Sequence, residues 1–184
     1  MLHMSAVYGL YLAFTAAKWQ TNIWNYAMVY YAATSITGGA HRLWTHKAYK
    51  ANVWVRIFYM IGTTIATQND VIEWARDHRC HHKWTDTDAD PHNINRGFFF
   101  AHMGWLMTRK HPKLKEMGKK IDISDLEADP ILQFQRRFYM VLVPVTFLFV
   151  MLVPCFFWDE EFFTAYHVVG TLRIAIILQG TWYE

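Results

Sequence analysis

Apolar residues of this chain are gathered into four long stretches, and polar residues fill the region between the second and the third. The stretches are residues 1–17, 23–40, 138–158 and 162–183. The first three contain no Asp, Glu, Lys or Arg, and the fourth contains only Arg173. Each approaches or exceeds the ~20 apolar residues that a helix needs to cross the hydrocarbon core of a bilayer. We therefore expect an all-α membrane protein whose four transmembrane helices form two hairpins.

The region between the hairpins, residues 41–137, is expected to form a helical lobe outside the bilayer. An uncharged run at residues 57–69 is too short to span and predicts an interfacial or buried helix. Residues 70–85 predict a polar helix, which the turn-forming residues 86–93 end. The aromatic-rich run 98–107 is also too short to span, and it predicts a second helix lying on the interface.

The distribution of charge indicates on which side of the membrane this lobe lies. The net charge is only +3, but sixteen of the eighteen Lys and Arg residues lie within residues 41–137. The positive-inside rule therefore places the lobe in the cytoplasm, with the connections at 19–22 and 159–161 on the opposite side. A nucleic-acid-binding surface is disfavoured, because the same region holds eleven acidic residues and no recognition motif.

Composition excludes several further classes of protein. Hydrophobic residues make up 53% of the 184 residues, while the mean hydropathy is only +0.02 because apolar and polar residues are segregated. That segregation excludes an ordinary soluble domain and a disordered chain. Two cysteines, one of them (Cys155) in a predicted span, do not make the framework of a secreted disulfide-rich protein.

Five of the ten histidines form two compact groups, His41 with His46, and His78 with His81 and His82. On a helix, positions i, i+3 and i+4 share one face, so the second group presents three imidazoles in one direction. Positions 41 and 46 lie about 140° apart on an ideal α-helix. They can serve one site only if the helix ends or bends between them, or they can serve two metals. Neutral imidazole suits Fe, Zn, Cu and Ni, and five imidazoles overfill one four-coordinate zinc, so we favour a dinuclear site.

The remaining polar groups of the lobe are expected to have structural or supporting roles. Asp86, Asp88 and Asp90 begin like a calcium loop, but Pro91 and Gly97 stand where that loop needs Gly and Glu. Their carboxylates are instead expected to pair with lysines or to hydrogen-bond the metal histidines. The other five histidines are interpreted as ordinary interfacial or core residues: His3, His92, His102, His111 and His167.

Five ordered sequence blocks carry a resemblance to a known family. The blocks HRLWTH, EWARDHRCHHKW, DTDADPHN, GFFFAHMGWL and RKHP resemble, in this order and spacing, the membrane acyl-CoA desaturases of the endoplasmic reticulum, of the stearoyl-CoA type. The block ISDLEADPILQFQRRFY is similar to insect members in particular. An HxxxxH motif alone is a weak signal, whereas five blocks that cover nearly the whole chain are a specific one.

The resemblance implies an enzyme that uses O2 to remove two hydrogens from a saturated fatty acyl-CoA, leaving a cis double bond at carbon 9 or 11. Electrons would arrive from cytochrome b5 and its reductase. In the family a non-haem di-iron centre is held by nine histidines, and His41, His46, His78, His81 and His82 match five of them. The third histidine box and a lone histidine after an Asn-Ser-Ala-Ala stretch have no match here. We therefore expect residues 1–184 to be a partial desaturase domain that lacks both ends.

The resemblance also implies a binding site for the coenzyme A moiety. Arg76 and Asp77, just before the second histidine box, match residues that contact CoA. Arg109 and Lys110 match residues that meet the CoA phosphates. As an alternative, Arg109 and Lys110 could anchor the lobe to lipid headgroups.

A further set of matched residues concerns the acyl chain. Asn69 matches a residue near the pantetheine or the acyl end, and Gln68, Trp74 and Thr181 match residues that line the bend fixing the site of desaturation. Trp74 could otherwise be an interfacial aromatic residue. In the small-residue run of the second apolar stretch, Ala33 is the position that we expect to limit the length of the acyl chain.

Two other functions stay open from the sequence. One is another histidine-box membrane di-iron enzyme, such as a lipid hydroxylase, which would add a hydroxyl group instead of a double bond. The other is an inactive, truncated metal-binding fragment or a metal carrier. Carriers usually place their ligands within the spans, whereas these histidines fall outside them, so the carrier ranks last.

Overall fold

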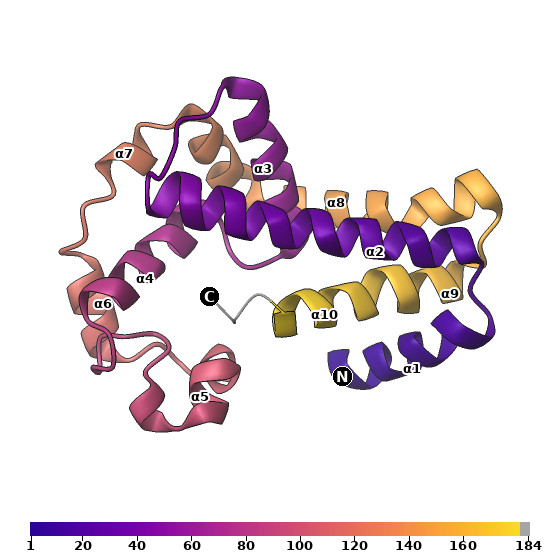
Figure 1. The fold of residues 1–184 in the computed structure, drawn as a ribbon, viewed down its shortest axis with the longest axis horizontal. Helices are drawn as coiled ribbons and strands as arrows, with labels where there is room; N and C mark the ends of the chain where they lie inside the picture. Colours follow the sequence, from indigo (N-terminus) through magenta and orange to yellow (C-terminus); the bar gives the residue numbers. More distant parts are fainter. Residues whose placement is uncertain (181–184) are drawn as a thin grey trace.

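The computed structural model describes residues 1–180 of the chain (Figure 1). In this part the chain is helical and has no strand, which confirms the all-α prediction. The four apolar stretches form most of the long helices. These are α1 (Leu2–Thr15), α2 (Trp19–Thr34), which continues into the π-helix η1 (Ser35–Thr45), α8 (Pro130–Trp158), and the consecutive α9 (Phe162–Ala165), η4 (Tyr166–Leu172) and α10 (Arg173–Gly180).

The lobe between these helices is built from shorter elements. They are α3 (Val53–Ala66), α4 (Val71–Lys83), η2 (Ile94–Arg96), α5 (Phe98–His102), η3 (Gly104–Met107), α6 (Pro112–Gly118) and α7 (Ser124–Glu127). The helices expected near residues 57–69 and 70–85 are confirmed. The single helix expected over residues 98–107 is wrong, because Met103 leaves the helical conformation at φ −142° and divides the run into α5 and η3.

Among the described residues, α8 is the one helix that is both long and apolar enough to cross a membrane. It has 29 residues, a mean hydropathy of 2.6 in its most apolar window, and only 17% of that window buried inside the protein. A core helix of a soluble domain would be covered, whereas α8 exposes Met140, Val145 and Phe156. The segment Phe162–Leu178 is apolar but shorter, and α1 has 14 residues. The arrangement of four spans in two hairpins therefore stays a prediction.

The α1–α2 and α8–α9 connections lie together at one end of the molecule, opposite α4 and α6 (Figure 1). Glu160 is buried there and accepts hydrogen bonds from the backbone N–H of Lys18, at 2.9 Å, and from the hydroxyl of Thr21. The Lys18 ammonium donates to the carbonyls of Trp158 and Asp159, each at 2.7 Å. The two connections predicted to share one side are thus bonded to each other, and the histidine-rich helices lie at the other end.

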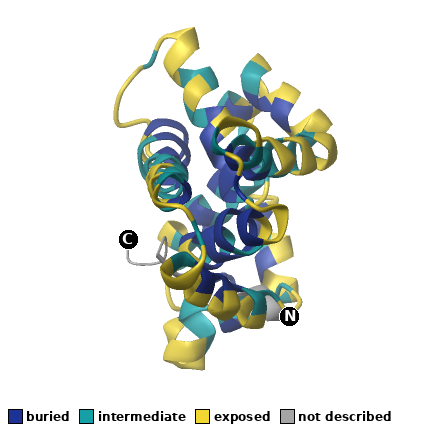
Figure 2. Ribbon diagram, turned by 90° about the vertical axis from the view of Figure 1, so that its right-hand side faces the viewer, coloured by how far each residue is buried: buried dark blue, intermediate teal, exposed yellow. Residues whose placement is uncertain are grey.

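Glycine allows two helices, α1 and α3, to approach their neighbours closely. A Cβ at Gly9 of α1 would lie 2.3 Å from the carbonyl oxygen of His167, and one at Gly62 of α3 would lie 2.0 Å from Ser35 Oγ. Buried residues accordingly gather where the helices face one another, and exposed residues cover the outer faces (Figure 2). The contact at Gly62 brings α3 against η1, which carries His41 and ends directly before His46.

Candidate metal centre and substrate cavity

His41 and His46 are brought together by the π-helix η1. The backbone N–H of His46 donates to the carbonyl of His41 at 3.0 Å, an i→i+5 bond, and the helix ends at Thr45. A π-turn places residue i+5 above residue i, and such turns are frequent at functional sites. The two imidazole rings are consequently 4.5 Å apart. One of the conditions set by the sequence, that the helix bends or ends between the two residues, is met.

The second histidine group lies on the last turns of α4. Asp70 begins this helix by accepting a hydrogen bond from the backbone N–H of Glu73 at 3.1 Å, as an N-cap residue does. The Nε2 atoms of His78 and His82, one turn apart, are 3.0 Å from each other. His81 turns instead toward the loop that follows the helix.

Four imidazoles from these two elements converge. One nitrogen from each of His41, His46, His78 and His82 lies within 4.8 Å of the others, and we call this set the four-histidine group. Across the two elements, the ring of His41 is 4.7 Å from that of His78, and the ring of His46 is 4.7 Å from that of His82. His78 is buried, whereas His46 and His82 are exposed, so the group is open on one side.

A second set of possible ligands, the His81 group, consists of His81, Asp90 and His92, again within 4.8 Å of one another. His81 Nδ1 is 2.8 Å from Asp90 Oδ1. Asp90 also accepts hydrogen bonds from the backbone N–H groups of Asp86, at 2.9 Å, and His92, at 2.8 Å. Two expected contacts of this loop are therefore present: an acidic residue bonds one of the clustered histidines, His81, and Asp88 pairs with Lys113 at 2.8 Å. That His81 binds a metal stays a prediction.

His92 was interpreted from the sequence as an ordinary interfacial or core residue, yet it lies beside His81 and Asp90. Its ring is 5.4 Å from that of His81 and 4.5 Å from that of Trp105. It stands ten residues after His82 in an irregular loop, so no helical spacing could have connected it to the other histidines. The acid-rich turn DTDADPHN was the only local sequence feature that could have indicated a role for His92 at this site.

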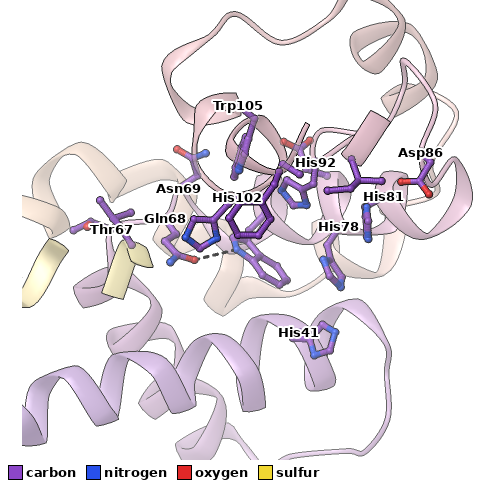
Figure 3. Close-up of a pocket in the computed structure, with 16 residues that line it drawn as sticks. His41, Thr67, Gln68, Asn69, His78, His81, Asp86, His92, His102 and Trp105 are labelled. Carbon is purple, nitrogen blue, oxygen red and sulfur yellow. Dashed lines mark hydrogen bonds between the residues drawn. The ribbon is translucent and has the colours of Figure 1, made fainter. Parts of the chain in front are cut away.

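A cavity of about 380 Å³ lies beside both groups (Figure 3). Its wall includes His41, His78, His81 and His92, and also Leu178 of α10. Figure 3 shows His41 approaching from a helix separate from the one that carries His78 and His81. Imidazoles from both groups thus lie beside a partly open, partly apolar space.

Three of the residues predicted to contact the acyl chain line this cavity: Gln68, Asn69 and Trp74. The Trp74 indole N–H donates to Gln68 Oε1 at 3.3 Å, and its ring stacks on His78 with centroids 4.9 Å apart. Ala33 is not part of the cavity wall. Thr181 lies outside the described residues.

Three of the four residues predicted to contact coenzyme A, Arg76, Asp77 and Lys110, are joined by ion pairs. Lys110 Nζ forms ion pairs with Glu73, at 2.7 Å, and with Asp77. Arg76 pairs with Asp77 at 2.9 Å. Asp77 alone of these residues also lines the cavity, whereas Arg109 is exposed and borders a separate small hollow with Lys110. The charged cluster Glu73, Arg76, Asp77 and Lys110 therefore stands at the edge of the cavity.

Comparison with known proteins gives strong matches, although no family model matches the sequence. The chain is 56% identical to the Delta(9)-fatty-acid desaturase fat-7 of Caenorhabditis elegans over 98% of its own length. It is 50% identical to the stearoyl-CoA desaturase of Homo sapiens and 47% identical to an acyl-CoA Delta12-desaturase of the insect Acheta domesticus, each over 99% of its length. This chain is a relative of acyl-CoA desaturases. It covers 54%, 51% and 51% of those three proteins, so it spans about half the length of the curated relatives it matches.

In this relative of the desaturases, the donor set fits a transition metal. Burial, with the neighbouring His41 as the next cause, lowers the pKa of His78 to about 2. Burial also lowers the pKa values of His46 and His82. These imidazoles are therefore neutral at neutral pH, the form that binds a metal. The hydrogen bond that His81 donates to the Asp90 carboxylate raises the pKa of His81 and fixes its ring orientation, as carboxylate partners of metal-bound histidines do.

Arg79 holds the two histidine-bearing elements of this desaturase relative together. Its guanidinium donates to the carbonyls of Trp44, at 2.8 Å, and Thr45, at 3.3 Å, which are the last residues of η1. On its other side it forms a two-pronged ion pair with Asp125, with N–O distances of 2.9 and 2.8 Å. Since Arg79 directly follows His78, it fixes α4 against the end of η1.

Replacing Asp125 with asparagine should lower the free energy of unfolding at pH 7 by about 1 kcal/mol. Hydrogen bonding from Arg79 lowers the pKa of Asp125 to about 2. A carboxyl whose pKa is depressed on folding stabilises the protein above its unfolded pKa, and that contribution is lost as the pH falls from about 4 to about 2. In chemical denaturation in detergent, the free energies of unfolding of wild type and variant should therefore differ at pH 7 and become equal below about pH 2. Glu116→Gln, which removes an exposed pair with Lys120, is the control; an equal effect of both substitutions would contradict the assignment.

Proposed function

We propose that this chain forms part of an acyl-CoA desaturase that introduces a cis double bond, at carbon 9 or 11, into a saturated fatty acyl-CoA. Two adjacent methylenes each lose one hydrogen, and O2, two electrons and two protons complete the balance by yielding two molecules of water. The observation that supports this proposal is the convergence of imidazoles from η1 and α4 on the wall of a cavity. The 56% identity to a nematode Delta(9) desaturase supports the same reaction.

Iron is the metal we propose for the two histidine groups, as a non-haem di-iron centre. The four-histidine group and His81 would be its ligands, and Asp90 would orient His81. A bound iron pair supplies, with O2, the oxidising chemistry that an unactivated methylene requires. The open side at His46 and His82 is where the further histidines of the family would complete the coordination.

Substrate binding is proposed to divide between the cavity and the charged cluster. The acyl chain would lie along Gln68, Asn69 and Trp74, which hold it beside His78 and exclude water. The CoA moiety would bind Arg76, Asp77 and Lys110 at the cavity edge, with Arg109 meeting its phosphates. Because Lys110 is paired with two carboxylates here, CoA phosphates would have to compete with Glu73 and Asp77 for its ammonium.

The cellular setting that we propose is the membrane of the endoplasmic reticulum. Four helices in two hairpins would span the bilayer, and the lobe with the histidines would lie in the cytosol and receive electrons from cytochrome b5. The exposed apolar surface of α8 and the bonding of the two hairpin connections at the opposite end support this orientation. We also propose that residues 1–184 belong to one desaturase domain.

Expression in yeast that lacks its own desaturase tests this function. A chimaera in which this chain replaces the matching segment of the nematode relative should restore growth without added unsaturated fatty acid. Mass spectrometry of the lipids should show cis double bonds and locate them, which also decides between carbon 9, carbon 11 and other positions. Hydroxylated fatty acids would establish the alternative, a lipid hydroxylase, and lipids without either group would refute both activities.

A further inference from the structure

Arg173 is a charged side chain inside the protein that the proposed reaction does not use. It is the only charged residue of the stretch 162–183, and it is 1% exposed. In the described part of the chain no carboxylate lies within ion-pair distance of its guanidinium. Its Nη1 donates instead to the carbonyl of Ile65 at 2.7 Å, and its Nε donates to the carbonyl of Val169 at 3.0 Å. A buried cation without a carboxylate is costly, so its place calls for a functional explanation.

The carbonyl of Ile65 lies in the last turn of α3, where carbonyl groups lack partners within the helix and carry partial negative charge. Arg173 supplies both a hydrogen bond and a positive charge to this helix end. Directly after this helix end the backbone adopts the left-handed conformation at two non-glycine residues, Thr67 with φ 58° and Asn69 with φ 69°. Non-glycine residues keep such conformations only where the surrounding structure holds them.

Gln135 of α8 holds the same segment from its other end. This side chain is completely buried. Its oxygen accepts from the backbone N–H of Val71 at 3.0 Å, and its amide nitrogen donates to the hydroxyls of Thr64, at 3.0 Å, and Thr63, at 3.2 Å. The segment from α3 to α4 is therefore fixed between α8 on one side and α10 on the other.

The segment held in this way is part of the cavity wall. Thr67, Gln68 and Asn69 line the cavity, and so does Leu178, which follows Arg173 on α10. Gln68 in turn accepts from Trp74, whose ring stacks on His78. A continuous set of contacts thus runs from Arg173 through the 67–69 turn to the four-histidine group.

We propose that Arg173 is a positioning residue that keeps α10 and the 67–69 turn in register and thereby selects which pair of methylenes faces the histidines. This role rests on the desaturase function proposed above. Arg173 acts through the cavity wall and does not touch the reacting atoms. Loosening its contact with Ile65 should let the acyl chain settle in more than one register, so that double bonds form at neighbouring positions.

Hydrogen exchange tests the contact independently of activity. In the purified chimaera, Arg173→Met should make the backbone amides of residues 67–70 exchange about tenfold faster, the effect of losing a hydrogen bond to a charged group. Arg173→Lys keeps the charge but not the two-point geometry, so its exchange should be intermediate. Thr21→Val, which removes a completely buried hydroxyl at the opposite end, should leave these amides unchanged. Equal exchange in wild type and both Arg173 variants would refute the contact's role.

The position of the double bond tests the consequence. Expressed in the same yeast, Arg173→Met should raise the share of displaced double bonds at least about fivefold, and Arg173→Lys should raise it about twofold. Thr21→Val should lower only the amount of enzyme and leave the positions of the double bonds unchanged. An unchanged distribution in folded Arg173 variants would overturn the proposal, and if the Met variant does not fold, the Lys variant decides. A wild-type chimaera that makes no double bond would refute the proposed function and with it the selective role, while the exchange data would still report on the contact.

Discussion

Replacing His78 with alanine should lower both metal content and desaturase activity by at least about 100-fold, since even the loss of outer partners of metal ligands costs about 10–100-fold. His78 is the buried member of the four-histidine group. Its ring lies 4.7 Å from those of His41 and His82 and 5.5 Å from that of His46. Removing it takes away the imidazole of α4 that lies beside both His41 and His46. The measurement is bound iron per chain and unsaturated product in the chimaera.

His111→Asn is the matched control for this substitution. His111 lies outside both ligand groups and begins α6 by accepting a hydrogen bond from the backbone N–H of Lys113 at 3.3 Å. Asparagine preserves such an N-cap, so metal and activity should stay within about twofold of wild type. Retention of iron by His78→Ala, or an equal loss in both variants, would show that His78 is not a ligand.

Replacing Asp90 with asparagine should lower metal affinity and activity by about 10–100-fold. The Asp90 side chain is completely buried in its pair with His81. Its carboxylate holds the Nδ1–H tautomer of His81 and leaves Nε2 for a metal. A neutral amide keeps the volume but loses the charge, so His81 would be a weaker and less well oriented ligand.

Asp88→Asn, two residues earlier, separates this effect from a general change in the acidic loop. The Asp88 side chain is 50% exposed and pairs with the surface residue Lys113. We expect it to change metal affinity by less than about twofold, because exposed ion pairs contribute little. Equal losses in the two variants would indicate that the loop as a whole, and not the bond to His81, supports the site.

Features encoded locally could be predicted from the sequence. The apolar stretches form helices, and α4 follows from a capping aspartate and a run of residues that tolerate helix. The spacing of His78 and His82 places their nitrogens one turn apart without any information from the rest of the fold. Each of these features depends on residues within a few positions of one another.

Features that depend on distant contacts could not be predicted. A helix of ordinary geometry separates His41 from His46, and their proximity requires the π-helix η1, which no propensity scale indicates. The contact between η1 and α4 depends on Arg79, whose partners at Trp44 and Asp125 are 35 and 46 residues away. Asp90 and His92 join the site through the path of an irregular loop. The resemblance predicted that Lys110 meets the CoA phosphates, but its ion pairs with Glu73 and Asp77 could be seen only in the structure.

Hydropathy predicts longer uniform spans than the structure has, because it does not detect where a regular helix is interrupted. The second apolar stretch continues into the π-helix, and the fourth contains the π-helix η4 and the buried Arg173. Composition treats such positions as part of a uniform span, whereas the fold uses them to bring helices together and to hold the cavity wall. The departures from regular helix therefore coincide with the elements that carry or support the candidate site.

X-ray absorption at the iron edge of the purified chimaera is the most direct test that η1 and α4 hold one centre. The spectrum should show scattering from imidazole nitrogens. That scattering should fall when His41, on η1, or His82, on α4, is replaced singly with alanine. Iron whose surroundings respond to only one of the two substitutions, or to neither, would contradict the shared centre and with it the oxidative function proposed for this chain.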